Sequence, residues 1–292
     1  MTGPKSLTAA ELRRHPLPEI SGGDKDSHGA ILIIAGSREV PGASLLTATA
    51  AMRSGAGKLQ LAVPEEIAIP VAIAMPEAMV VGHKSGRDGG FSPSGLRTIM
   101  DQAGKADTIV AGPGLARSDS AAKLAKDLCA LGKPLVLDAA MLHELPAQAR
   151  DARAAEIPPI LLPHAGEMAS LLGCEPEDVE EDPLASGATC ADRYGSIVLV
   201  KGVQSHIVTP DGQSWKYSGG APGLGVSGSG DVLAGIVGGL LARGAAPLTA
   251  LLWAVWLHGE AGRTLSKSIG EVGFLAREIA GCVPMLLSKT AR

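Results

Sequence analysis

Aromatic side chains are scarce in this sequence. Its 292 residues include three Trp, two Tyr and two Phe, or 2% in total. Proteins that bind single-stranded nucleic acid stack bases on several aromatic rings, and so few rings exclude such a platform. Basic residues are not in excess either, because 26 Lys and Arg stand against 30 Asp and Glu, a net charge of −4. We therefore expect no nucleic-acid partner.

Cysteines are few and scattered along the chain. The four are Cys129, Cys174, Cys190 and Cys282. No two stand at the C-x-x-C spacing of a zinc site or redox pair, and scattered thiols are typical of a reducing compartment. Residues 1–14 have no apolar segment of a secretory leader. The most apolar run, 232–242, is too short to span a bilayer. We expect a cytoplasmic protein that does not bind a membrane.

Hydrophobic residues, by contrast, make up 46% of the chain, enough for a large core. Short β-branched runs alternate with segments rich in Ala and Leu. The predicted strands are residues 31–34, 59–63, 108–111, 135–138, 160–162 and 197–201, and the predicted helices among them are 43–54, 118–130 and 167–172. Repeated strand–helix units indicate an α/β fold, a doubly wound and mainly parallel sheet with helices on both faces.

The pattern changes after residue 204. Two short strand-like runs, 205–208 and 214–217, flank Asp211-Gly212, which predicts a hairpin. Further helices are predicted over 231–243, 248–264 and 272–283. No linker or repeat divides the chain. We therefore expect an N-terminal arm over 1–23, with one helical turn at 8–14, and a single domain over 24–292, in which regular structure begins at Ile31.

Unusual residues follow the predicted strands where each one ends. They are Gly36-Ser37, Gly112-Pro113-Gly114, Asp138, His164 and Lys201-Gly202. In a doubly wound sheet, ligands bind at the carboxyl ends of the strands. The sequence therefore predicts a ligand site along this edge of the sheet.

The strongest local signal is Gly228-Ser229-Gly230-Asp231, directly before a predicted helix. Glycines let backbone N–H groups turn toward one point, and a helix N-terminus adds partial positive charge, so the segment predicts an anion hole for phosphate. Asp231 can then accept a proton from a substrate hydroxyl. Asp231 can also simply favour the helix dipole. The overlapping G-x-G-x-x-G at 223–228 follows no strand, which argues against a dinucleotide-binding fingerprint.

Two more segments have both a structural and a functional interpretation. His164-Ala165-Gly166-Glu167 joins a strand to a helix, and H-x-x-E alone is not a zinc motif. His164 can cap the helix or bind substrate, and Glu167 can hold Mg²⁺ through water. Lys201 can contact phosphate or be a solvated strand end. His258 has no visible partner, and we interpret it as structural.

Eight ordered segments together carry a family resemblance. They are Asp24-Lys25; Ala35-Gly36-Ser37 with Pro41-Gly42-Ala43; residues 51–58; Ala111 to Gly114; Leu135 to Ala139; Pro163 to Met168; Val200 to Gly202; and Gly228 to Gly235. In this order they resemble the ADP-dependent NAD(P)H-hydrate dehydratases of the ribokinase-like superfamily, over about residues 24–283. Leu162, Ala140 and Ala221 depart from the family pattern, whereas Ser229 and Ser205 replace Thr and keep the hydroxyl.

The resemblance implies a repair activity. Such enzymes act on the S-epimer of hydrated NADH or NADPH, which they phosphorylate from ADP with Mg²⁺. They then eliminate phosphate, so the products are NAD(P)H, AMP and phosphate. The resemblance also implies a homo-oligomer, for example a tetramer. It further implies that the protein works with a separate NAD(P)H-hydrate epimerase, since the chain shows only a short arm where some relatives carry an epimerase domain.

The resemblance also implies residue roles. Asp231 would be the catalytic base, and Gly228, Ser229 and Gly230 the anion hole. Ala43, Gly114, His164 and Asp231 would contact the hydrated cofactor. The nucleotide would be bound by Lys201, Gly202, Val203, Gln204, Ser205 and Gly230, and Glu167 would hold Mg²⁺ through water.

Two alternatives stay open at this point. A vitamin-alcohol kinase of the same superfamily would use the same glycine loop and base but would release a phosphorylated product. The segments around Ala43 and His164 favour the dehydratase over this kinase. A non-catalytic nucleotide sensor is the other alternative, and the intact segment from Gly228 to Asp231 argues against it.

Overall fold

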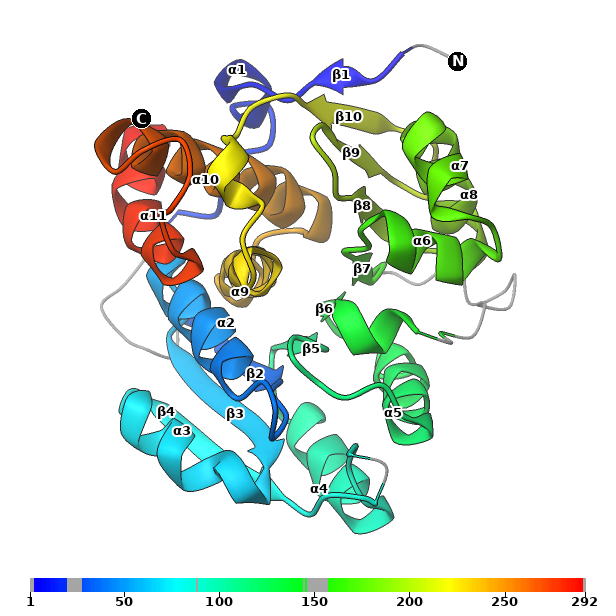
Figure 1. The fold of residues 1–292 in the computed structure, drawn as a ribbon, viewed down its shortest axis with the longest axis vertical. Helices are drawn as coiled ribbons and strands as arrows, with labels where there is room; N and C mark the ends of the chain where they lie inside the picture. Colours follow the sequence, from blue (N-terminus) through cyan, green and yellow to red (C-terminus); the bar gives the residue numbers. More distant parts are fainter. Residues whose placement is uncertain (1–2, 20–27, 88, 144, 146–156, 291–292) are drawn as a thin grey trace.

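The computed structural model describes residues 3–19, 28–87, 89–143, 145 and 157–290. Its centre is one ten-stranded sheet in the order β1-β10-β9-β8-β7-β6-β5-β2-β3-β4 (Figure 1). The strands are β1 (Lys5–Ser6), β2 (Ala30–Ile34), β3 (Lys58–Pro64), β4 (Ala78–His83), β5 (Thr108–Ala111), β6 (Leu135–Leu137), β7 (Ile160–Leu161), β8 (Ile197–Val200), β9 (Ser205–Val208) and β10 (Ser214–Tyr217). Neighbouring strands are parallel except where β9 pairs with β8 and β10.

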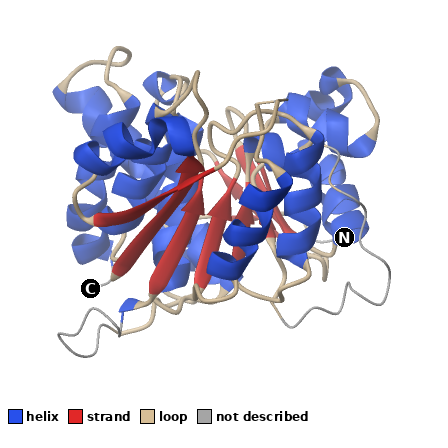
Figure 2. Cartoon of the chain, turned by 90° about the horizontal axis from the view of Figure 1, so that it is seen from below, coloured by secondary structure: helices blue, strands red, loops and turns tan. Residues whose placement is uncertain are grey.

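Helices cover both faces of this sheet (Figure 2). One layer, which we call the inner layer, comprises α1 (Ala9–Leu12), α2 (Gly42–Arg53), α3 (Ala68–Ala74), α9 (Ser229–Ala242), α10 (Pro247–Ser268) and α11 (Ala276–Thr290). The opposite layer, which we call the outer layer, comprises α4 (Pro93–Ala103), α5 (Asp119–Cys129), α6 (Ala165–Leu172), α7 (Pro176–Glu181) and α8 (Pro183–Tyr194). The predicted α/β class with a mainly parallel, doubly wound sheet is confirmed.

The predicted strands and most predicted helices match the structure to within two residues. Buried parallel strands are continuous apolar runs, and Ile31 to Ile34 are completely buried. The hairpin over 205–208 and 214–217 is also present. The last two helices are the exceptions. α10 ends at Ser268 rather than at 264. α11 spans Ala276–Thr290 rather than 272–283, and it begins later because Gly270 and Gly273 have φ angles of 148° and 99° and close a loop between α10 and α11.

The N-terminal arm differs from the expectation that regular structure begins at Ile31. β1 pairs parallel with β10 at the edge of the sheet, and Leu7 and Leu12 are buried. Trp215 on β10 donates an indole hydrogen bond to Glu11, and Trp253 on α10 donates one to the carbonyl of His15. Within residues 3–19, β1 therefore extends the sheet and the following residues pack against it, while residues 20–27, which include Asp24-Lys25, lie outside the described residues.

Helix α9 is the most buried helix of the inner layer. Nearly every residue from Val232 to Ala242 is buried, because the sheet lies on one side of α9 and α2, α10 and α11 lie on the other. Its glycines permit this depth: a Cβ on Gly235 would lie 2.2 Å from the carbonyl oxygen of Thr47 on α2. Within the described part of the chain, no helix is both long and apolar enough to cross a membrane.

Candidate active site

The candidate site lies at the carboxyl edge of the sheet, where the unusual residues follow their strands. The loops after β2, β5, β6, β7 and β8 meet there, together with the N-terminus of α9. Gly36 donates a backbone hydrogen bond to the carbonyl of Pro113, so the loops after β2 and β5 are in direct contact. The parallel register of β2, β5 and β6 brings these strand ends to one level.

The turn before α9 has the geometry of an anion hole. Gly228 is the N-cap of α9 and has a φ angle of 88°, a conformation that glycine adopts without strain. A Cβ at Gly228 would also lie 2.5 Å from the side chain of Leu46 on α2. Helix α9 then begins at Ser229, two residues before the predicted start. The first N–H groups of a helix have no intrahelical acceptor, and the helix dipole adds positive charge, so this turn suits a phosphoryl group.

Asp231 lies in the first turn of α9, directly after the glycines. Burial, and to a smaller extent the negative charge of Asp138, raises the pKa of Asp231 to about 6, although the charge of Lys201 opposes the shift. A carboxyl with a pKa near 6 is ionised at neutral pH and is still a competent proton acceptor.

A buried ion pair lies next to the anion hole. Lys201 Nζ is 2.8 Å from Asp138 Oδ1 and 3.7 Å from Glu167 Oε2. Burial alone would lower the pKa of Lys201, but the carboxylates of Asp138 and Glu167 raise it overall, so the ammonium stays charged. A Cβ placed on Gly230 would lie 3.7 Å from Lys201 Nζ and 3.8 Å from Asp138 Oδ2. The cation is thus within reach of an anion bound at Gly230.

His164 and Glu167 form a capping box at the start of α6. His164 Nδ1 accepts hydrogen bonds from the backbone N–H of Gly166 at 3.0 Å and of Glu167 at 3.3 Å. Glu167 Oε2 accepts the backbone N–H of His164 at 2.9 Å. The capping role considered for His164 is therefore present. Because 56% of its side chain is exposed at the site edge, the imidazole is also accessible to a ligand.

Ala43 and Gly114 come together across two loops. Ala43 lies in the first turn of α2 and is buried, and Gly114 follows β5 with a φ angle of 65°. A Cβ on Gly114 would lie 2.4 Å from the Cβ of Ala43. The methyl group of Ala43 thus fills the space beside Gly114, and a larger residue at Gly114 would collide with it.

The stretch from Lys201 to Ser205 divides into two parts. Lys201 points into the buried cluster, whereas Gly202, Val203 and Gln204 form an exposed turn, with Val203 fully exposed. Ser205 begins β9 and is partly buried. The turn lies at the margin of the site rather than inside it.

Two residues have a place at the site that their local sequence does not predict. The sequence places Asp138 at a strand end, but it does not reveal the pairing of Asp138 with Lys201, which is 63 positions away. His258 lies within α10, yet its Nε2 is 3.0 Å from Ser229 Oγ. Only the three-dimensional proximity of distant segments reveals these contacts.

The residues also fit a weakly held Mg²⁺. Glu167 and Asp138 offer carboxylate oxygens, which suit this ion. Among the described residues, three or more His, Cys, Asp or Glu side chains nowhere gather into a complete metal-binding group. Mg²⁺ with a nucleotide usually keeps several waters, takes one or two carboxylates and binds phosphate oxygens, which is compatible with this arrangement.

Comparison with protein families decides the affiliation, because a family model described as NAD(P)H-hydrate dehydratase matches residues 31–284. The chain belongs to this dehydratase family. An ADP-dependent (S)-NAD(P)H-hydrate dehydratase of Xanthomonas campestris is 45% identical over 300 aligned residues, which cover 100% of both chains. A bifunctional NAD(P)H-hydrate repair enzyme of Moorella thermoacetica is 34% identical over 96% of this chain and 53% of its own length.

Solved structures agree with the family. The ADP/ATP-dependent NAD(P)H-hydrate dehydratase of Bacillus subtilis, co-crystallised with ATP and Mg²⁺, matches with a TM-score of 0.86 and 26% identity, over 99% of this chain and 100% of that one. A ribokinase-like superfamily protein of Enterococcus faecalis matches with a TM-score of 0.80 and 25% identity, over 99% and 97% of the two chains. The expected ribokinase-like fold is thereby confirmed, as is the resemblance to the dehydratase family.

Proposed function

We propose that this protein is an ADP-dependent (S)-NAD(P)H-hydrate dehydratase, which restores NADH and NADPH from their hydrated forms with release of AMP and phosphate. The observation that carries the proposal is the turn from Gly228 to Asp231, with a base of pKa about 6 beside an anion hole and the Lys201 cation next to it. Kinship with enzymes named for this activity supports the choice of substrate.

In the first step, Asp231 accepts the proton of the ring hydroxyl while the hydroxyl oxygen attacks the β-phosphorus of ADP. A new P–O bond forms, and the bond between the β-phosphorus and the bridging oxygen breaks, so AMP leaves with the electron pair. Backbone N–H groups at Gly228 and Gly230 and the ammonium of Lys201 stabilise the negative charge on the transferred group, whereas the N–H of Ser229 donates to the carbonyl of Val226. In the second step, the C–O bond breaks and its electron pair leaves with phosphate. The neighbouring carbon gives up a proton, which the departing phosphate takes, and the C–H electron pair forms the double bond of the ring.

The other assignments belong to the same proposal. Ala43, Gly114 and His164 contact the hydrated cofactor, as the family resemblance implies, and Ala43 and Gly114 lie side by side at the carboxyl edge of the sheet. The stretch from Lys201 to Ser205, together with Gly230, binds the nucleotide. Glu167 would hold Mg²⁺ through water, and the ion would supply charge neutralisation at the phosphates.

Three broader features complete the proposal. We infer a homo-oligomer in the cytoplasm, as the family resemblance implies. A separate NAD(P)H-hydrate epimerase would supply the S-epimer. Relatives named as bifunctional repair enzymes support this link, because this chain spans only about half of their length, for example 53% of the one from Moorella thermoacetica.

The direct test is recovery of the near-ultraviolet absorbance of NADH from NADH hydrate. Wild-type protein with ADP and Mg²⁺ should restore it, with AMP and phosphate formed in equal amounts, and ATP should be a poorer donor. Asp231→Asn should lower kcat at least a thousandfold while ADP binding, measured by calorimetry, changes less than about threefold. Phosphorylation of a vitamin alcohol without NADH recovery would favour the kinase instead, and full turnover by Asp231→Asn would exclude Asp231 as the base.

A further inference from the structure

His258 on α10 is in direct contact with the anion-hole turn. Its Nε2 lies 3.0 Å from the hydroxyl of Ser229 and 3.1 Å from the carbonyl oxygen of Ser229. Burial lowers the pKa of His258 to about 4, so the imidazole is neutral at physiological pH. One neutral ring therefore holds both the side chain and the backbone of the first residue of α9.

The Ser229 hydroxyl is directed at this imidazole. Ser229 is only 6% exposed, and its Oγ is within hydrogen-bond distance of His258 Nε2. The carbonyl oxygen of Ser229 can only accept, so these contacts require the tautomer with a proton on Nε2, which donates to the carbonyl oxygen and to Oγ. His258 therefore anchors Ser229 through both its hydroxyl and its carbonyl group.

Helix α10 supports the whole glycine-rich loop that leads to the turn. A Cβ on Gly259 would lie 2.3 Å from the ring of Tyr217, where the loop begins, and a Cβ on Gly262 would lie 2.5 Å from Leu224, near its middle. His258 contacts Ser229, where the loop ends. One turn of α10 thus contacts the start, the middle and the end of this loop. Gly259 and Gly262 do so by close packing, and His258 does so through hydrogen bonds.

We propose that His258 is a positioning residue of the phosphoryl-transfer site, which fixes Ser229 and thereby the N–H groups of Gly230 and Asp231 and the carboxylate of Asp231. The inference rests on the proposed function, since the position of these groups matters only if a phosphoryl group is transferred there. A displacement of about 1 Å in such a group costs on the order of a hundredfold in rate. The effect should therefore appear in kcat rather than in the KM for ADP.

The test compares His258→Leu, which removes the hydrogen bonds, with His258→Gln, whose amide can reach the place of Nε2. We expect kcat to fall about 30-fold in His258→Leu and no more than about threefold in His258→Gln, with the KM for ADP within threefold of wild type in both. In Ser229→Ala the further loss caused by His258→Leu should shrink to about fivefold or less, because the two residues act through one contact.

His83 is a matched control. It is a buried histidine on β4, away from the site, with hydrogen bonds to Thr98 at 2.8 Å and Gln102 at 3.0 Å. His83→Leu should lower the thermal midpoint about as much as His258→Leu, yet leave kcat of the folded enzyme within twofold of wild type. If His258→Leu and His83→Leu lost equal amounts of kcat, the loss would reflect the removal of a buried histidine from the fold and not its place beside the anion hole. That result would overturn the proposal. So would a folded His258→Leu enzyme with kcat within twofold of wild type.

A second readout does not depend on the identity of the substrate. Binding of inorganic phosphate, followed by phosphorus-31 NMR, requires the anion hole but no hydrated cofactor. We expect phosphate to bind about fivefold more weakly to His258→Leu and as in wild type to His83→Leu. If wild-type protein fails to restore NADH, the proposed function fails, and phosphate binding still decides the role of His258. Unchanged phosphate affinity in His258→Leu would overturn that role by itself.

Discussion

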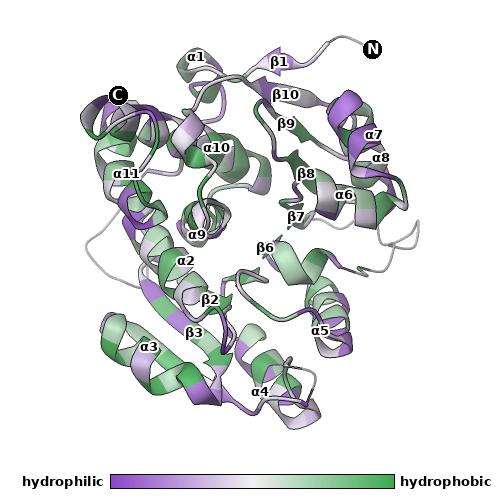
Figure 3. Ribbon diagram, viewed as in Figure 1, coloured by the Kyte–Doolittle hydropathy of each residue, from purple (hydrophilic) through white to green (hydrophobic). Residues whose placement is uncertain are grey.

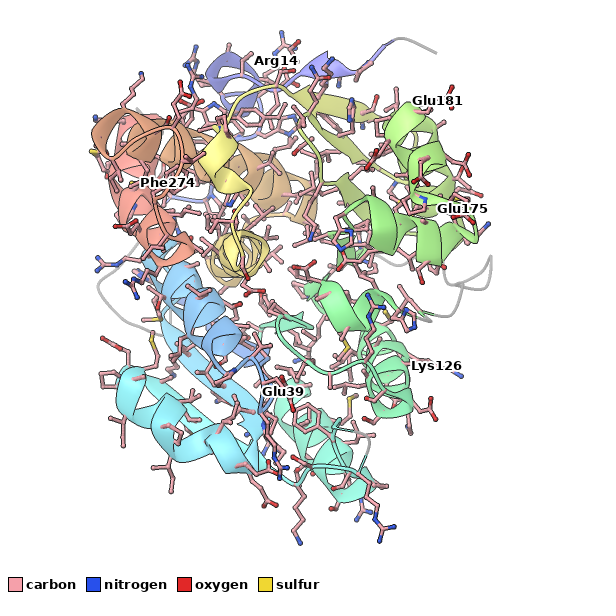
Figure 4. The ribbon with its side chains drawn as sticks, in the orientation of Figure 1. Arg14, Glu39, Lys126, Glu175, Glu181 and Phe274 are labelled. Carbon is pink, nitrogen blue, oxygen red and sulfur yellow. The ribbon has the colours of Figure 1, made fainter. Side chains whose placement is uncertain are left out.

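The two helical layers differ in depth. In the inner layer, α9 is enclosed by the sheet on one side and by α2, α10 and α11 on the other. The outer layer is a single row of amphipathic helices with apolar residues on one side only, and Lys126, Glu175 and Glu181 project outward from its surface (Figure 4). The hydropathy colours show the same contrast, with α7 hydrophilic and α10 largely hydrophobic (Figure 3).

The candidate site takes different groups from the two layers. The inner layer supplies the anion hole, Asp231 and His258, whereas α6 of the outer layer supplies His164 and Glu167. The anion hole and Asp231, which must keep their positions during the reaction, are thus attached to a helix whose displacement would disturb tight packing. His164 and Glu167 begin a helix of the less enclosed layer, where a small displacement costs less free energy. The predictions below test this division.

Gly235→Ala in α9 should have the largest effect. Its Cβ would lie 2.2 Å from the Thr47 carbonyl oxygen and 2.7 Å from the Cβ of Ala50, so α2 and α9 would have to separate. We expect the free energy of unfolding, measured by chemical denaturation, to fall by about 3 kcal/mol or more.

The matched control for this change is Gly281→Ala in α11. No atom lies within 4 Å of the position of that Cβ, and Gly281 is exposed. Alanine has the higher helix propensity, so Gly281→Ala should stabilise the protein by about 0.5–1 kcal/mol. A Gly235→Ala variant that loses less than about 1 kcal/mol would contradict the tight packing of the inner layer.

Lys201→Met removes the cation at the boundary between the layers. Asp138 and Glu167 would lose their partner, and the transferred phosphoryl group would lose a positive charge in a partly buried setting. We expect kcat/KM to fall about a hundredfold. Lys123→Met is the control, because Lys123 pairs with Asp127 on the exposed face of α5 and should change kcat/KM less than twofold. More than a third of wild-type activity in Lys201→Met would exclude a role for this charge.

The pH dependence of kcat/KM should follow Asp231. Because the pKa of Asp231 is raised to about 6, the base becomes protonated as the pH falls below that value, and kcat/KM should drop about tenfold per pH unit. Asp138→Asn should move this limb to lower pH, since the charge of Asp138 contributes to the raised pKa. If kcat/KM of the wild type fell only below about pH 4, the result would contradict the burial of Asp231 and its raised pKa.

The same shift predicts a stability effect of opposite sign. A carboxyl whose pKa rises from 3.8 to about 6 on folding binds more protons folded than unfolded between these values. Stability contributed by this group is therefore lost as the pH rises through that window. Asp231→Asn cannot ionise and should be more stable than wild type at pH 7, by on the order of 1–2 kcal/mol. A lower thermal midpoint for Asp231→Asn would show that the charge is stabilised by contacts instead.

The sequence predicts the inner architecture better than the edges. Completely buried strands such as β2 and β5 are continuous apolar runs, and capped helices such as α5 carry local signals. Three elements over 64–107, namely α3, β4 and α4, are not predicted, because α3 is short and contains Pro70 and β4 is a half-exposed edge strand. The two-residue β1 depends on pairing with β10, about 210 residues later, and has no local signal.

The same distinction holds at the site. Gly228 to Asp231, His164 and Lys201 stand at strand ends or before a helix, where residue type and position together indicate a ligand site. The Asp138–Lys201 pair spans 63 positions and the Ser229–His258 contact spans 29. Such contacts depend on the packing of distant elements, which one sequence does not reveal.

The smallest effect is expected at His164 in the outer layer. Its side chain caps α6 and is also proposed to contact the hydrated cofactor. Asn is a good N-cap, so His164→Asn should keep the start of α6 intact and change the free energy of unfolding by less than about 0.5 kcal/mol, whereas His164→Ala should cost about 1 kcal/mol. If the imidazole also contacts the hydrated cofactor, both variants should raise the KM for NADH hydrate by about three- to tenfold with little change in kcat. Ser118→Ala, which removes the cap of α5, should lower stability without changing KM. An unchanged KM in His164→Asn would leave His164 with the cap alone, and recognition of the hydrated ring would then rest on Ala43, Gly114 and Asp231.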